Sequence, residues 1–173
     1  MADTPHSAAI TAPAATVERW RDAVQHGDAD AAVACLSPDI VLSSPLTDQY
    51  RVQGPHQMHD FLTSAFTAVK GIRFHTLTGQ GNSYAVAYRA KVGSQPFEEA
   101  QLLRLDEQAR INEITLFGRP MPALTALMIT LGPQLARQQG RRGLAALLRI
   151  SSAPVHSMVG FGDRRIVPLT RPA

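Results

Sequence analysis

One carboxylate, Glu99, could perform acid–base chemistry inside the protein. The segment FEEAQLLRLD (97–106) alternates like a strand. Because strand side chains alternate between two faces, Glu99 and Gln101 share the predicted inner face with Leu103. Burial would raise the pKa of Glu99 toward the value that a general acid or base needs.

The plainer interpretation of the same residues is a turn. If QPFEE (95–99) still belongs to a hairpin connection, Glu98 and Glu99 are both solvated and neither is catalytic. The sequence leaves both interpretations open.

Histidine is the other residue type that titrates near neutrality. His59, on a predicted helix, is the second candidate acid or base, although a surface role is the plainer interpretation. His56 and His59 lie three residues apart but lack a third ligand, so we predict no metal site. Cys35 is predicted to be a core residue, because nothing nearby would activate a thiol.

Polar and aromatic residues could complete a binding site around Glu99. Tyr88 and Gln101 are candidate hydrogen-bonding residues that orient a substrate, and Trp20 and Tyr84 are candidate walls. The competing interpretation is that Trp20 and the tyrosines are ordinary core.

The elements that would position these residues are helices first and strands afterwards. A helix should begin near Thr16 and end at Gly27, and Asp28 should cap a second helix. The pattern further predicts a strand at 39–44, a loop at 46–55, a helix at 55–69 and strands at 71–81, 83–92, 97–106 and 109–118. This order indicates an α+β fold with an antiparallel sheet curled around the helices.

Two motifs resemble a known superfamily. The opening ERWRDAVQHGDADAAVACLSPDIVLSSP (18–45) and the hairpin LRLDEQARI (103–111) look like the nuclear-transport-factor-2-like proteins, which include ketosteroid isomerase, limonene epoxide hydrolase and SnoaL-like polyketide cyclases. The resemblance covers roughly residues 15–120. It implies a cone-shaped curved sheet wrapped around three N-terminal helices, a deep apolar pocket, and a homodimer formed through the outer sheet face.

The resemblance also identifies residues that are missing. Ser44 stands where ketosteroid isomerase has its base, Trp20 where it has its oxyanion tyrosine, and Gln101 where it has a protonated aspartate. The two carboxylates of limonene epoxide hydrolase would fall on the Tyr84–Tyr88 strand and near Leu116, where no acid is present. Neither of these two mechanisms is therefore expected.

Of the three kinds of enzyme named, only the SnoaL-like cyclases remain as a model for the activity that the resemblance implies. We expect a cofactor-free cyclase, isomerase or hydrolase/hydratase for an apolar, polyketide- or terpenoid-like molecule. Glu99 or His59 would be the acid–base group and Tyr88 a catalytic hydrogen-bonding residue. The substrate-binding residues would be Trp20, Ser44, Tyr84, Gln101 and Leu116. The alternative is a non-catalytic binding or dimerisation module of the same fold.

The chain has three predicted parts: a flexible N-terminus (1–14) of small and polar residues, the cone domain (15–120) implied by the resemblance, and a basic amphipathic helical extension (121–173). Residues 1–118 have nine basic and thirteen acidic side chains, whereas residues 119–173 have eight arginines and one acid, Asp163. A lid or dimer element is the favoured role for the extension, an anionic membrane surface the second, and nucleic acid a distant third.

The remaining features suggest a cytoplasmic protein. A chain of 173 residues with a single cysteine fits one domain and an appendage in a reducing compartment. The N-terminus lacks the features of a secretory signal, and no unbroken run of 18 apolar residues predicts a membrane span.

Overall fold

The computed structural model describes residues 11–138 and 140–170, apart from the side chain of Tyr50. Most of the predicted flexible N-terminus lies outside the described residues. The elements are α1 (Ala12–His26), α2 (Ala29–Val33), β1 (Leu36–Ser44), β2 (Thr47–Gln53), α3 (Gly54–Ala68), β3 (Val69–Gln80), β4 (Ser83–Val92), β5 (Gln95–Leu105), β6 (Ile111–Arg119), α4 (Met121–Gln138) and α5 (Arg142–Phe161). Short helical turns follow at Gly162–Ile166 and Val167–Thr170.

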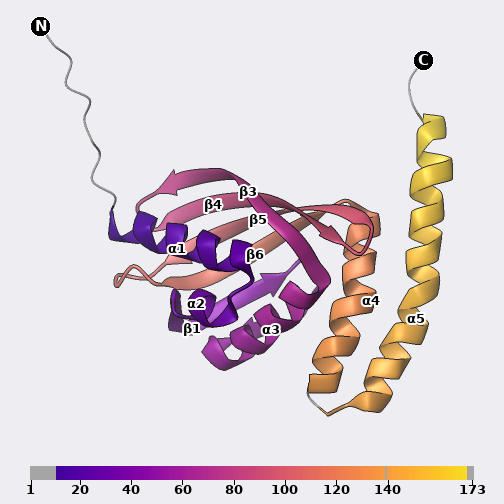
Figure 1. Ribbon diagram of the computed structural model, residues 1–173, viewed down its shortest axis with the longest axis horizontal. Coiled ribbons are helices and arrows are strands. Elements are labelled where there is room, and N and C mark those ends of the chain that lie inside the picture. The colour runs from indigo at the N-terminus through magenta and orange to yellow at the C-terminus, as the bar shows by residue number, and fades with distance from the viewer. Residues whose placement is uncertain (1–10, 139, 171–173) are drawn as a thin grey trace, which may run out of the picture.

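A single curved sheet with the strand order β2-β1-β6-β5-β4-β3 forms the body, and α1, α2 and α3 lie on one side of it (Figure 1). The predicted α+β class and the curved sheet are confirmed. The sheet is mixed and not wholly antiparallel, because β1 pairs in parallel with β6. The chain between β1 and β6 is long enough for the crossover that parallel strands require.

The core lies between the sheet and the three N-terminal helices. From α1 it takes Val17, Trp20 and Val24, which recur at helical spacing, and from α3 it takes Met58 and Leu62. Burial of this apolar surface is the main stabilising contribution and holds α1 and α3 against the strands.

The helix signals were partly correct. Gly27 ends α1 with a φ of 73°, and the Asp28 side chain accepts a hydrogen bond from the amide of Ala31, as predicted. The predicted start was wrong, because α1 begins at Ala12 with Pro13 in its first turn. Thr16 is buried within the helix, where its hydroxyl donates to the carbonyl of Ala12.

The segment predicted as a loop after Pro45 is instead strand β2. Its residues pair with β1 in an antiparallel hairpin, with Ser44 opposite Thr47 and Leu42 opposite Val52. The sequence misled because β2 is short, polar and at the sheet edge, where a strand needs few apolar residues.

The C-terminal extension consists mainly of the helices α4 and α5. Helix α4 runs without interruption through Gly132 and Pro133, although proline removes one backbone donor. Helix α5 packs on α4 and extends beyond the body, with α4 between it and the sheet (Figure 1). The described residues that follow α5 are helical up to Thr170.

One helical stretch, Arg142–Thr170, is long and apolar enough to cross a membrane by length and composition alone. An 18-residue window within it has a mean hydropathy of 1.2, and 17% of that window is buried. The sequence argument missed this stretch because isolated polar residues interrupt the apolar ones. Length and composition are weak evidence for a span, since core helices pass the same test.

Gly118 of β6 lets α4 approach the sheet next to Glu99. A Cβ atom at Gly118 would lie 2.7 Å from Cδ2 of Leu124 and 3.0 Å from Cε2 of Phe97. We expect Gly118→Ala to lower the free energy of unfolding by about 1–3 kcal/mol, because the core is overpacked there. Urea unfolding measures the effect.

A matched control is Gly143→Ala in α5, where an added Cβ meets nothing within 4 Å. This variant should stabilise the protein by up to about 1 kcal/mol, because alanine favours the helix. Equal effects of the two variants would contradict the packing described for Gly118.

Candidate active site

The carboxyl group of Glu99 is buried, with 4% of the residue exposed. In the register of the sheet, Glu99 lies opposite Tyr88 on β4 and opposite Gly118 on β6. The Tyr88 hydroxyl donates a hydrogen bond of 2.8 Å to Oε1 of Glu99, and Nε2 of Gln101 donates one of 3.1 Å to the same oxygen. No described residue donates a hydrogen bond to Oε2.

Trp20 fixes the orientation of the Gln101 amide. The indole Nε1 of Trp20 donates to Oε1 of Gln101 over 2.9 Å. Since that oxygen is occupied, the NH₂ group of Gln101 is turned toward Glu99. Trp20 on α1, Gln101 and Glu99 on β5, and Tyr88 on β4 thus form one buried chain of hydrogen bonds.

Burial raises the pKa of Glu99 to about 7, because the charged carboxylate loses its hydration. The hydrogen bonds from Gln101 and Tyr88 act in the opposite direction and lower this pKa. The pKa of Tyr88 is raised well above its usual value, first by burial and then by the charge of Glu99. Near neutral pH, Glu99 therefore exists in both protonation states while Tyr88 stays a donor.

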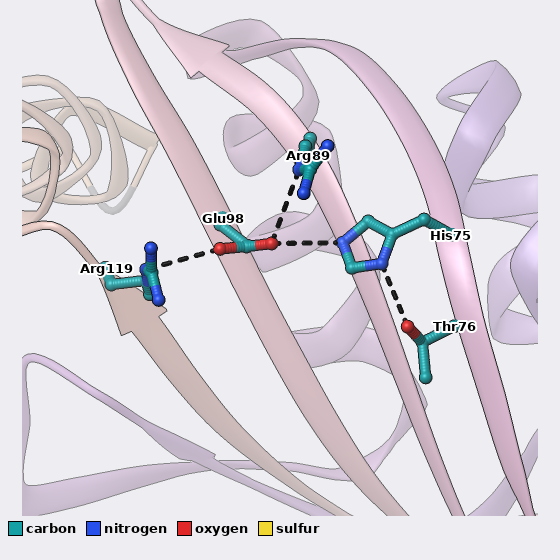
Figure 2. Close-up of polar contacts among 5 residues, drawn as sticks. All are labelled: His75, Thr76, Arg89, Glu98 and Arg119. Carbon is teal, nitrogen blue, oxygen red and sulfur yellow. Dashed lines mark hydrogen bonds and ion pairs between the residues drawn. The ribbon is translucent and has the colours of Figure 1, made fainter.

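The neighbouring Glu98 has the opposite environment on the outer face of the sheet (Figure 2). Its Oε1 lies 3.2 Å from Nε2 of His75 and 3.4 Å from Nε of Arg89, and its Oε2 lies 3.2 Å from Nε of Arg119. His75 Nδ1 in turn lies 2.9 Å from Thr76 Oγ1. Strand alternation thus places one glutamate among cationic side chains and the next in the core.

The interpretation that both glutamates are solvated is therefore wrong. Strand β5 already begins at Gln95, so Glu99 lies well inside it. The segment QPFEE contains turn-forming residue types, but Pro96 does not end the pairing, because β5 and β4 are in register from Gln95 onward.

A small cavity of about 50 Å³ lies in front of Glu99. Most of the predicted site residues line it, namely Trp20, Ser44, Tyr88, Glu99, Gln101 and Leu116. Phe61 and Leu62 of α3 add apolar surface, and so do Leu127 and Leu131 of α4. The cavity is therefore mainly apolar, with its polar groups gathered at Glu99.

Two predicted residues do not join this group. His59 lies on the outer side of α3, with 44% of its side chain exposed, and its Nε2 is 3.1 Å from Oδ1 of Asp30. Tyr84 is buried but does not line the cavity, because it lies four residues before Tyr88 on β4, opposite Leu103. Neither residue is in a position to touch a molecule beside Glu99.

Ser44 lines the cavity, but its hydroxyl also has a structural role. Its Oγ accepts a hydrogen bond of 3.2 Å from the amide of Leu46 in the β1–β2 turn. A serine hydroxyl has no accessible pKa near neutrality, so Ser44 does not replace the missing base before Pro45.

The sequence analysis favoured a lid or dimer element for the extension but did not identify the residues of α4 that close the cavity. The available signal was the spacing of Leu127 and Leu131, which lie one helical turn apart on the apolar face. A cavity of about 50 Å³ is far smaller than the roughly 300–1,000 Å³ of typical ligand sites. A polycyclic ligand would therefore require these two leucines to move.

The described part of the chain has no cluster of side chains that could bind a metal ion. Within residues 11–138 and 140–170, no group of three or more His, Cys, Asp or Glu side chains could hold a metal ion. Burial raises the pKa of the Cys35 thiol, so this cysteine is predominantly protonated at neutral pH.

Solved structures share the fold. A steroid delta-isomerase from Pseudomonas aeruginosa is 24% identical with a TM-score of 0.64, covering 80% of this chain and 96% of that chain. A cystatin-like-fold protein from Silicibacter pomeroyi is 22% identical with a TM-score of 0.67, and the match covers 75% of this chain and 93% of that chain. A putative polyketide cyclase from Sinorhizobium meliloti is 19% identical with a TM-score of 0.52, and the match covers 60% of this chain and 94% of that chain.

A comparison with curated proteins gives no match. The sequence profile of the SnoaL-like domain matches residues 17–114, more than half of the chain. This range includes most of α1, all of α3 and the strand β5 that holds Glu99, and it ends before α4. The chain therefore belongs to the SnoaL-like domain family.

Proposed function

We propose that this protein is a cofactor-free acid–base enzyme that isomerises or cyclises an apolar, polyketide- or terpenoid-like molecule. The observation that carries the proposal is the buried Glu99, which faces an apolar cavity with a pKa of about 7. A carboxyl group with this pKa can both take and return a proton at neutral pH.

In the proposed reaction, Oε2 of Glu99 takes a proton from a carbon next to a substrate carbonyl. The electron pair of the broken C–H bond becomes an enolate, and Glu99 becomes a neutral acid. Return of the same proton to another carbon gives an isomer. Alternatively, the enolate carbon attacks a second carbonyl and closes a ring, and the alkoxide formed from that carbonyl takes the proton back from Glu99. Tyr88 and Gln101 stabilise the carboxylate before the transfer through their bonds to Oε1.

The related structures support this class of chemistry. Their names include a steroid delta-isomerase, a putative polyketide cyclase and an epoxide hydrolase/cyclase-like enzyme. The likeness concerns the fold, so the reaction type is inferred from Glu99. Because Ser44 stands before Pro45, the proposed base acts from β5 and not from β1.

The second candidate is a non-catalytic binding module. The observation that favours it is the small volume of the cavity, which Leu127 and Leu131 close from α4. In this case Glu99 would serve only as a hydrogen-bonding group for a bound molecule.

Deuterium incorporation distinguishes the two functions. The protein is first purified gently and any retained ligand is identified by native mass spectrometry. That ligand, together with a panel of polyketide- and terpenoid-like ketones, is then incubated in D₂O with wild type and with Glu99→Gln. We expect deuterated or cyclised product with wild type and a rate at least about 100-fold lower with the variant. A ligand that binds but is unchanged by both proteins would favour the binding module.

The raised pKa of Glu99 also affects stability. Since the folded state holds this proton more tightly, wild type should lose stability as pH rises from about 4.5 to about 7. The loss should reach about 3 kcal/mol, and Glu99→Gln, which is neutral at every pH, should avoid it. Urea unfolding of both proteins across this range should show the variant gaining relative stability as pH rises. A difference that does not change with pH would contradict the raised pKa.

The Tyr88 hydroxyl should set the midpoint of this pH dependence. Its hydrogen bond lowers the pKa of Glu99, so Tyr88→Phe should shift the loss of stability to higher pH by about one unit. Tyr84→Phe is the matched control, because Tyr84 is buried on the same strand and does not line the cavity. An equal shift in both variants would argue against a specific effect of the Tyr88 hydroxyl.

A further inference from the structure

We propose that the outer face of α5 binds to the surface of an anionic lipid bilayer. Four large apolar side chains lie on this face at intervals of three or more residues: Leu147, Ile150, Met158 and Phe161 are 62%, 72%, 74% and 58% exposed. Positions spaced in this way form one stripe along a helix. Pro154, also exposed, continues the stripe between Ile150 and Met158.

The distribution of side-chain size on α5 is the reverse of that in a core helix. The residues of α5 that are buried are small, namely Ala145, Ser152 and Gly160. The contact between the two helices includes a polar pair, in which Nδ1 of His156 lies 2.9 Å from Oγ1 of Thr125. The largest exposed apolar side chains of α5 are therefore not among those that its contact with α4 covers. An exposed stripe of this kind is typical of an interaction surface.

Charge identifies the partner as anionic. The stripe is bordered by Arg141 and Arg142 before it and by Arg164 and Arg165 after it, and the only acidic residue of the extension is Asp163. If the α5 helices of two copies paired in antiparallel orientation, Arg141 and Arg142 of one copy would lie beside Arg164 and Arg165 of the other. If they paired in parallel orientation, each arginine would lie beside the same arginine of the other copy. Repulsion disfavours both arrangements, whereas an anionic bilayer attracts all of these arginines.

The helix is proposed to lie on the bilayer and not to cross it. Arg149 lies within the apolar part of α5, and a guanidinium in the hydrocarbon core is costly. In a helix parallel to the surface, the long side chain of Arg149 can reach the headgroups while the stripe is buried.

Vesicle sedimentation of the full chain tests the proposal. Vesicles of phosphatidylcholine with about 30 mol% phosphatidylglycerol should bind the protein, and vesicles of phosphatidylcholine alone should bind it at least about tenfold more weakly. Met158→Glu should weaken binding to the anionic vesicles by about tenfold or more, because an apolar side chain is lost and a negative charge is added. Met121→Glu is the matched control, since Met121 is 61% exposed at the start of α4 and should bind as wild type does.

A second variant reports the depth of insertion. Trp20 is 1% exposed, so its emission should not change on binding. Phe161→Trp places a second indole on the stripe, and its emission should shift to shorter wavelength with anionic vesicles.

Absence of vesicle binding by the wild-type protein would overturn the proposal. Self-association that Met158→Glu abolishes, without vesicle binding, would identify a second copy as the partner instead. Protein that resists extraction from vesicles at high salt and alkaline pH would indicate a helix that spans the bilayer.

Discussion

The site depends on the burial of one carboxyl group. Glu99 lies in the core between β4 and β6, where an ionised carboxylate loses most of its hydration. Two hydrogen bonds, from Tyr88 and Gln101, offset part of that cost but leave the pKa near 7. Burial of Glu99 beside the apolar cavity therefore costs the protein stability at neutral pH. Such a cost is typical of functional sites and unusual for a structural residue.

The position of Glu99 was predictable because strand alternation is a local rule. Once Leu103 is taken as inward, Gln101 and Glu99 must share its face, and the resemblance placed Trp20 nearby. The hydrogen bond from Trp20 to Gln101 was not predictable, because it joins residues far apart in the sequence. His59 was a poor candidate for a related reason: a histidine on an amphipathic helix gives no indication of which side faces the cavity.

The C-terminal extension shows a second limit of sequence reasoning. Leu127 and Leu131 were recognisable as an apolar helix face, but only the packed structure shows that this face closes the cavity. The loop predicted after Pro45 failed because an edge strand needs little apolar signal. Helix α4 links the two proposals, since its inner face meets the cavity and its outer face carries α5. A bilayer-bound α5 would hold the cavity close to a source of apolar molecules.

The most direct test of this account is the pKa of Glu99 itself. A ¹³C NMR titration of the side-chain carboxyl carbons, with Glu99→Gln used to assign the signal, measures it without any substrate. The account predicts a midpoint near 7 for Glu99. A midpoint close to the ordinary value of 4.5 would contradict it, because the carboxyl group would then be hydrated or fully compensated and would be no better an acid or base than a surface glutamate.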